Sequence, residues 1–194
     1  MAEGDVRAEL LAAGERVFAA RGYAKATVDD VIRSSGTSRA SFYRYFTGKE
    51  QLYEELSRAC GREMRDAIGA FGALGSPPGR AEITELLLEY QSLNDRYGGV
   101  IRAWTELTSP AESPLRDRSV AAVRAMFEHT ADALVHTEGR DTGSHDLATR
   151  AALLFLLVER SSFYVSSRVS RIEPRRLTPT LATLVERAYF PGPS

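Results

Sequence analysis

The sequence is poor in the features that mark secreted and membrane proteins. Among its 194 residues there is one cysteine, Cys60, so no internal disulfide can form and a reducing compartment is expected. The longest apolar run, residues 151–158, is far too short to span a bilayer, and residues 1–10 contain no apolar signal region. We therefore expect a cytoplasmic protein with no membrane partner.

Signatures of catalysis and of metal binding are also missing. The sequence has no phosphate-cradling glycine loop, no metalloprotease His-Glu pair and no nucleophile elbow. His129 and His136 are seven residues apart and could share a helix face, but no further ligand cluster accompanies them. Cys60 fits a packed thiol better than a redox sensor. We expect a protein that is not an enzyme and that holds neither a cofactor nor a metal.

The chain as a whole has almost no net excess of positive or negative charge, but one short segment has a local excess. The net charge is -1, and residues 1–60 carry nine basic and nine acidic side chains, so any nucleic-acid footprint must be local. Residues 37–49 contain Arg39, Arg44 and Lys49 and no acidic residue. This short segment is the one place where the charge pattern favours an anionic partner.

Alternating strand patterns are nearly absent, and helical periodicity fills the chain. A first helix is expected over residues 5–21, ended by Gly22. Thr27 should cap a second helix that Gly36 ends, and Ser38 should cap a third. Thr47 and Glu50 form a capping-box pattern that predicts the start of a fourth. Further helices are expected at 80–95, 97–108, 114–138, 145–168 and 176–190, with a break at Gly98-Gly99.

A stretch rich in glycine and proline, residues 69–79, separates two parts of the chain. It predicts a small N-terminal domain over residues 1–50, a linker helix over 48–70, and a larger C-terminal domain over 71–194. The fold class is expected to be all-α, with about nine helices.

Residues 36–50 read as a turn, a short basic and aromatic helix, a second turn and a helix start, which is the second half of a helix-turn-helix unit. Arg39 can pair with guanine, Ser41 with several bases, and Ala40 can touch a thymine methyl group. Tyr43, Arg44 and Tyr45 suit phosphate contacts, and Lys49 and Thr27 lie at helix starts that favour an anion. A bland helical hairpin with a solvated basic face is the alternative. The candidate DNA-binding residues are Thr27, Ser38, Arg39, Ala40, Ser41, Tyr43, Arg44, Tyr45 and Lys49.

The same residues resemble the N-terminal pattern of TetR-family transcriptional regulators. The resemblance covers about the first 60 residues and includes Ala-x-x-Val-Phe near residues 13–18, Gly22-Tyr23, Thr27, Gly36, and residues 41–46 followed by Lys49-Glu50. It departs from the family pattern at Val31-Ile32, where Ile-Ala is frequent, and at Ala40, where a glycine or similarly small residue is frequent. The resemblance implies a nine-helix subunit with three DNA-binding helices, an effector site and a dimer contact in the C-terminal helices, and DNA contacts at the candidate positions.

The C-terminal part is rich in aromatic residues at helical spacing, which fits either ordinary core packing or the lining of a pocket. A lined pocket would take a small, largely apolar or aromatic molecule. Arg102 and Glu106 form either a surface ion pair or a ligand anchor, and Glu159 is a surface residue, a pocket acid or a dimer contact. The candidate ligand-binding residues are Tyr90, Arg102, Trp104, Phe127, Phe155 and Glu159.

These observations favour a homodimeric repressor that a small effector releases from a double-stranded DNA operator. The dimer is expected to form a four-helix bundle from the 145–168 and 176–190 helices of both subunits. Two other functions stay open: a constitutive DNA-binding protein without a ligand, and a helical enzyme or interaction module with a vestigial helix-turn-helix.

Overall fold

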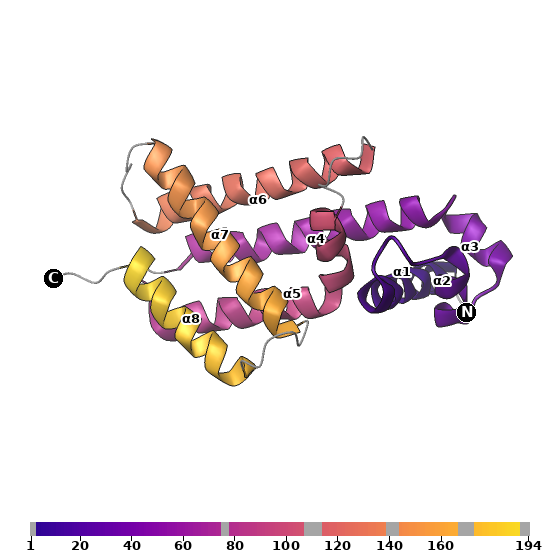
Figure 1. Ribbon diagram of the computed structural model, residues 1–194, viewed down its shortest axis with the longest axis horizontal. Helices are drawn as coiled ribbons and strands as arrows, with labels where there is room; N and C mark the ends of the chain where they lie inside the picture. The colour runs from indigo at the N-terminus through magenta and orange to yellow at the C-terminus, as the bar shows by residue number, and fades with distance from the viewer. Residues whose placement is uncertain (1–2, 75–77, 107–113, 139–143, 167–172, 191–194) are drawn as a thin grey trace. The chain divides into compact units, whose positions relative to one another are not determined.

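The computed structural model describes residues 3–74, 78–106, 114–138, 144–166 and 173–190, and in these ranges the chain is helical without any strand. Eight helices follow one another: α1 (Glu3–Arg21), α2 (Val28–Ser35), α3 (Arg39–Tyr45), α4 (Lys49–Gly72), α5 (Arg80–Glu106), α6 (Pro114–Glu138), α7 (Ser144–Ser166) and α8 (Pro174–Tyr189) (Figure 1). The all-α prediction is confirmed.

The chain forms two compact units that are not consecutive segments. Unit 1 contains residues 1–62 and 96–120, and unit 2 contains residues 63–95 and 121–194. Helices α4, α5 and α6 therefore each contribute to both units. The expected functional division into residues 1–50 and 71–194 follows a different criterion and stays a prediction.

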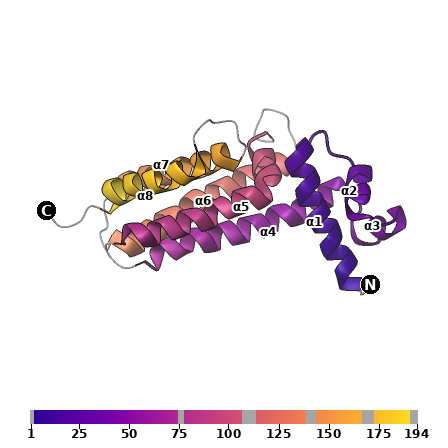
Figure 2. The same cartoon turned by 90° about the horizontal axis from the view of Figure 1, so that it is seen from below.

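Unit 1 is built on the apolar stripe of α1. Leu10, Ala13, Val17 and Phe18 are all buried, as their helical spacing predicts. Helices α1, α2 and α3 contact one another and gather together in both ribbon views (Figure 2). This cluster gives the short helices α2 and α3 a tertiary support that isolated helices of their length lack.

The predicted helix ends of unit 1 are largely confirmed. Gly22 and Gly36 have positive φ values of 73° and 69°. Residues with a Cβ adopt such a backbone conformation only with strain. Ser38 caps α3 by accepting a hydrogen bond from the amide of Ser41 at 3.0 Å. The start of α4 differs from its prediction, because the helix begins at Lys49 and the amide of Thr47 donates to Gln51 Oε1 at 2.7 Å. Its partner is thus Gln51 and not Glu50.

The predicted break at Gly98-Gly99 is wrong, since α5 runs without interruption from Arg80 to Glu106. Gly99 is placed where a backbone passes very close. A Cβ at this position would lie 2.2 Å from the carbonyl carbon of Phe18 in α1. Two helices that were expected separately are therefore one, and the described residues hold eight helices where about nine were expected.

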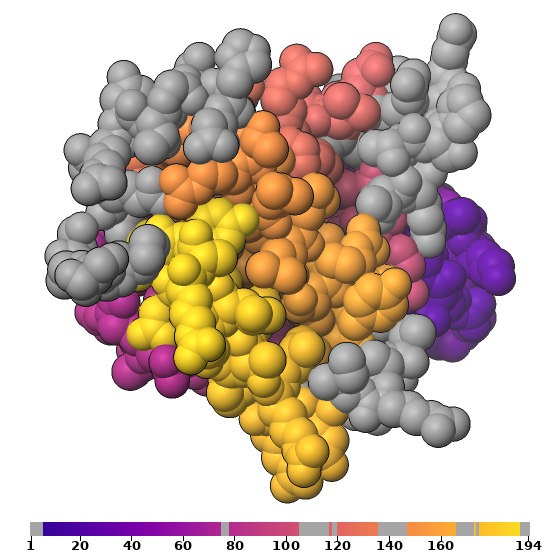
Figure 3. Space-filling view, turned by 60° about the vertical axis from the view of Figure 1, so that its left-hand side comes forward, coloured from indigo at the N-terminus to yellow at the C-terminus, as the bar shows by residue number. Residues whose placement is uncertain are grey.

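Unit 2 packs its remaining helices around an aliphatic and aromatic core. Ala151, Leu154 and Val158 of α7 and Leu181 and Val185 of α8 are buried. Helices α7 and α8 are in contact and lie side by side on one face of the space-filling view (Figure 3). Large apolar side chains that remain exposed on these two helices are Leu153, Leu156, Leu157, Tyr164 and Leu184.

Candidate nucleic-acid interface

Helix α3 has one buried face and one solvent-facing face. Phe42 and Phe46 are almost completely buried, and their ring centroids lie 5.7 Å apart. Because this anchoring fixes the rotation of α3, Arg39, Tyr43 and Arg44 stand on its exposed face. A polar face held by a buried aromatic pair is the geometry that a recognition helix needs to enter a major groove.

The predicted DNA-contacting residues are together accessible on unit 1, and we call this set the recognition surface. Thr27, Ser38, Arg39, Ala40, Tyr43 and Arg44 are exposed, whereas Ser41, Tyr45 and Lys49 are half-buried. At the N-terminal end of α3 the hydroxyls of Ser38 and Ser41 are 2.9 Å apart, so they hydrogen-bond to each other. Either hydroxyl can still accept or reorient toward a base or phosphate.

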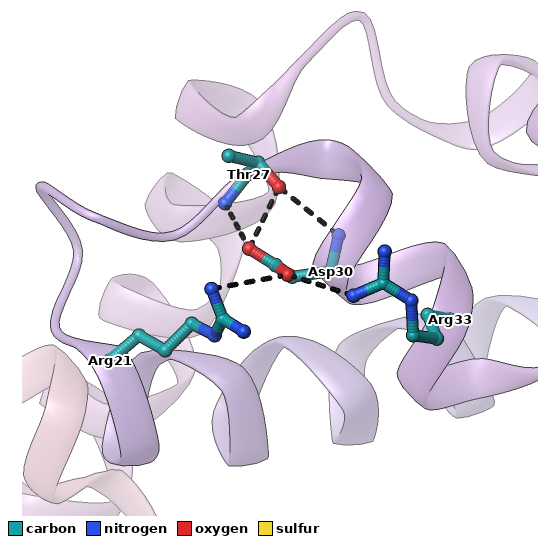
Figure 4. A network of polar contacts seen from close by, with 4 residues as sticks. All are labelled: Arg21, Thr27, Asp30 and Arg33. Carbon is teal, nitrogen blue, oxygen red and sulfur yellow. Dashed lines mark hydrogen bonds and ion pairs between the residues drawn. The ribbon is translucent and has the colours of Figure 1, made fainter.

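Thr27 is fixed by a compact polar network at the start of α2 (Figure 4). Its backbone amide and its hydroxyl both donate to Asp30 Oδ2, at 3.1 Å and 2.8 Å, and its hydroxyl accepts from the Asp30 amide at 3.2 Å. The other carboxylate oxygen of Asp30 pairs with Arg21 at 3.4 Å and Arg33 at 3.3 Å. This capping box sets the direction in which α2 presents its first amides.

The pKa of the Asp30 carboxyl is lowered. The hydrogen bond from the Thr27 side chain is the main cause, with help from the Thr27 amide, Arg21 and Arg33, and burial opposes the change. Asp30 is only 8% exposed, so its carboxylate interacts with Thr27, Arg21 and Arg33 and is not displayed on the surface.

Lys49, the first residue of α4, contacts Tyr23 in the segment between α1 and α2. The Lys49 ammonium donates to the Tyr23 carbonyl at 3.0 Å and lies 4.5 Å from the centroid of the Tyr23 ring. The Tyr23 hydroxyl donates to Glu50 Oε1 at 3.4 Å. Burial, with the nearby charges of Glu50 and Glu54, raises the pKa of Tyr23 to about 12. Lys49 therefore has a structural contact in addition to its predicted phosphate contact.

A separate apolar cavity of about 20 Å³ lies inside unit 2. Predicted ligand residues Tyr90 and Phe155 line it, and the Phe127 ring lies edge-on to Phe155 with centroids 5.2 Å apart. Thr130, which also lines the cavity, donates its hydroxyl to the Met126 carbonyl at 2.8 Å. The complete lining is Ile68, Phe71, Tyr90, Thr130, Ala133, Leu134, Leu154, Phe155 and Val158.

Four of the six predicted ligand residues do not line this cavity: Arg102, Trp104, Phe127 and Glu159. Trp104 and Arg102 belong to unit 1, where the indole N–H donates to the Ser57 hydroxyl at 2.7 Å and the Arg102 guanidinium donates to the Ala19 carbonyl at 2.9 Å. The side chain of Glu106 falls outside the described residues. The structure thus brings together Tyr90, Phe127 and Phe155 and leaves the Arg102 and Trp104 assignments without support from the cavity.

Glu159 is only 8% exposed, so it is not a solvated surface residue. It follows Val158 of the cavity lining, and its carboxylate is 3.5 Å from the Arg160 guanidinium. Burial raises the pKa of its carboxyl, and the charge of Arg160 opposes that change. A buried carboxyl of this kind would disfavour an anionic molecule nearby.

The described residues carry neither a metal-binding cluster nor a membrane-spanning helix. There, no group of three or more His, Cys, Asp and Glu side chains is placed to hold a metal ion. Within the same ranges, no helix combines the length and apolarity that crossing a membrane requires. Cys60 is buried in α4, as the prediction of a packed thiol requires.

Sequence and fold comparisons agree with this geometry. The family model described as "Bacterial regulatory proteins, tetR family" matches residues 10–56, which contain α2, α3 and the recognition surface. The chain is thus similar to TetR-family regulators over residues 10–56. The DNA contacts assigned to residues of this segment stay predictions.

Individual TetR-family relatives extend the match. The chain is 25% identical over 138 residues to the transcriptional regulator EthR of Mycolicibacterium smegmatis, which covers 60% of this chain and 64% of that protein, just under two thirds of its length. It is 24% identical over 202 residues to the transcriptional repressor DhaR of Mycobacterium sp., covering 99% of this chain and 96% of that one. These names agree with the prediction that the chain is not an enzyme.

The fold of a solved relative matches nearly the whole chain. The crystal structure of the MbdR regulator from Azoarcus sp. CIB superimposes with a TM-score of 0.72 at 17% identity, covering 93% of this chain and 96% of that one. At this identity the likeness establishes the TetR-like fold and leaves ligand and operator to be argued from residues.

Two groups of residues in this chain escaped sequence reasoning. The ion pair between Asp29 and Arg39 was not predicted, because the two residues are ten positions apart in different helices. The exposed leucines of α7 were also missed, since Leu153, Leu156 and Leu157 lie within a run that is apolar on every face. Only a three-dimensional core distinguishes the inward leucines from the outward ones.

Proposed function

We propose that this chain is a TetR-family DNA-binding regulator of transcription, acting as a repressor at a double-stranded operator. The observation that carries the proposal is the solvent-facing side of α3, where Arg39, Tyr43 and Arg44 stand opposite the buried Phe42 and Phe46. The segment 37–49 brings three cations and no acid to this surface. Such a local charge excess supports backbone contacts in a chain whose net charge is otherwise close to zero.

Two substitutions on the recognition surface test this assignment. Arg39→Ala should weaken binding to a selected operator by about 1–3 kcal/mol and relax the preference at one base pair. Tyr43→Phe should weaken binding to all duplexes alike, because the hydroxyl is assigned to a phosphate. Gel shifts on operator and scrambled duplexes measure both effects. Lys49 is less suitable, since its contact with Tyr23 couples DNA binding to the local fold.

Unchanged affinity in both variants would remove the recognition-surface assignment. It would favour a helical interaction module with a vestigial helix-turn-helix.

The proposal includes a homodimer formed through α7 and α8. Leu153, Leu156, Leu157 and Tyr164 on α7 and Leu184 on α8 are between 37% and 56% exposed. Exposed large apolar residues concentrated on two neighbouring helices favour burial against a partner. A second copy of the same two helices would complete a four-helix bundle, and the two-fold symmetry would present two recognition helices.

The proposal further includes a small, uncharged, largely apolar or aromatic effector in unit 2. The cavity lining is apolar apart from the hydroxyl-bearing residues Tyr90 and Thr130, and the buried Glu159 follows the lining residue Val158 in sequence. The effector would act by favouring a dimer whose recognition helices no longer fit half-sites about 34–36 Å apart. Tenfold release requires the ligand to bind the released form about 1.4 kcal/mol better than the DNA-bound form.

One observation favours the alternative of a constitutive DNA-binding protein. The cavity of about 20 Å³ accommodates roughly one water molecule, whereas ligand pockets measure about 300–1,000 Å³. An effector would have to select a more open form of unit 2. A cavity-filling substitution, described in the Discussion, separates the two functions.

A further inference from the structure

The arginine assigned to base reading is held by a carboxylate from another helix. Arg39 Nη1, in the first turn of α3, donates to Asp29 Oδ1, in the first turn of α2, at 2.6 Å. Both side chains are 60% exposed, so the ion pair stands at the solvent-facing edge of the recognition surface. DNA that meets Arg39 therefore also meets Asp29.

This contact leaves the base-reading capacity of Arg39 intact. A guanidinium carries several N–H donors in a planar fork, and the bond to Asp29 uses one of its terminal nitrogens. On another side, the Arg39 guanidinium carbon lies 5.9 Å from the centroid of the Tyr43 ring. A carboxylate and an aromatic ring thus restrict a long side chain that would otherwise sample many rotamers.

The neighbouring aspartate does not share this task. Asp30 is buried, and its two carboxylate oxygens bind Thr27, Arg21 and Arg33 (Figure 4). The carboxylate of Asp29, in contrast, is exposed and pairs with Arg39. The pair Asp29-Asp30 therefore divides into one residue that closes the α2 cap and one that faces the incoming nucleic acid.

We propose that Asp29 is a positioning residue that makes Arg39 select a guanine edge over a phosphate, and this inference rests on the proposed DNA-binding function. The physical reason is charge. A phosphate is an anion, so its attraction to Arg39 is offset by repulsion from the adjacent Asp29 carboxylate. The O6 and N7 atoms of guanine are uncharged acceptors, so their bidentate bonds to the oriented guanidinium survive. Asp29 thereby lowers binding to sequences without the base while keeping binding to the operator.

The test compares the full-length wild type with Asp29→Asn and Asp29→Glu. The control Asp66→Asn removes the charge of another exposed aspartate, in the part of α4 that belongs to unit 2. Affinities are measured at one fixed salt concentration for a duplex selected by the wild type and for a scrambled duplex of equal length and composition. Thermal melting of each variant checks that unit 1 remains folded.

Asp29→Asn should bind the scrambled duplex about three- to tenfold more tightly, the scale of one exposed charge on a phosphate-binding surface. Affinity for the selected duplex should change less, so the ratio of the two affinities falls. Asp29→Glu should restore the ratio, because it keeps the negative charge. In an Arg39→Ala background, Asp29→Asn should no longer alter the preference at the base pair that Arg39 reads, since the residue acts through Arg39.

Two outcomes overturn the inference while leaving the proposed function standing. In the first, Asp29→Asn and Asp66→Asn change both affinities by the same factor. In the second, Asp29→Asn lowers the ratio equally with and without Arg39. A wild-type protein that selects no duplex at all would instead overturn the proposed function, and this inference with it.

Discussion

Val158 is the residue at which adding a single methyl group tests whether unit 2 binds an effector. Its side chain lines the cavity of about 20 Å³ in unit 2 together with Tyr90 and Phe155. The space suits about one water-sized group, so a single added methyl can occupy it. The residue that follows, Glu159, is buried.

Val158→Ile should fill the cavity and leave the fold intact, with the melting temperature unchanged or raised by the equivalent of about 0.5–2 kcal/mol. If unit 2 binds a neutral aromatic effector there, wild-type protein should release its operator in the presence of a neutral one- or two-ring probe such as indole or naphthalene. The variant should respond several-fold more weakly. Val135→Ile, the same change at an exposed position of α6, is the matched control.

Equal responses from wild type, Val158→Ile and Val135→Ile would place any ligand elsewhere. No response from the wild type to the whole panel would favour the constitutive function.

Residue-level partners were the least predictable part of this chain. Helical spacing correctly identified Trp104 as an inward-facing residue, and it is 3% exposed. Its hydrogen-bond partner, Ser57, is 47 positions away in α4, and no local pattern encodes that pairing. Burial follows from periodicity within one helix, whereas the identity of the neighbour depends on how helices pack.

At the scale of elements, the Gly98-Gly99 pair shows that a glycine has two different uses. From the sequence alone the pair predicts a break between two helices, because glycine disfavours a helix interior. The structure keeps both residues in α5 and places Gly99 against the backbone of Phe18. By contrast, Gly22 and Gly36 do end helices, and their left-handed φ values explain why those ends were predicted correctly. A single sequence does not separate a terminating glycine from one that allows close packing.

Substituting the two glycines one at a time tests this explanation. Gly99→Ala should destabilise unit 1 by about 1–3 kcal/mol or more, because backbone atoms of Phe18 cannot move as a flexible side chain can. Gly98→Ala should be neutral or stabilising by up to about 1 kcal/mol, since a Cβ there meets nothing within 4 Å. Denaturant unfolding of the two variants gives the comparison. Equal effects would mean that α5 does not approach α1 closely in solution.

At the scale of the whole molecule, the all-α class and the position of the recognition surface were predicted from the sequence. Both depend on local signals: helix caps, the aromatic pair Phe42 and Phe46, and the cations between residues 37 and 49. The ranges expected to form the dimer, 145–168 and 176–190, correspond to α7 and α8, and their part in a dimer stays a prediction. The sequence did not indicate that Leu153, Leu156 and Leu157 are the exposed leucines of α7.

The central claim is that two copies of this chain place two recognition helices on one operator. Selection of duplexes from a random pool by the full-length wild type tests it most directly, followed by sedimentation of the protein with the enriched duplex. We predict an enriched inverted repeat, with half-site centres about one helical turn or a multiple of it apart, bound by a whole number of dimers. A protein that enriches no sequence, or that binds the enriched site as a single monomer, would contradict the claim.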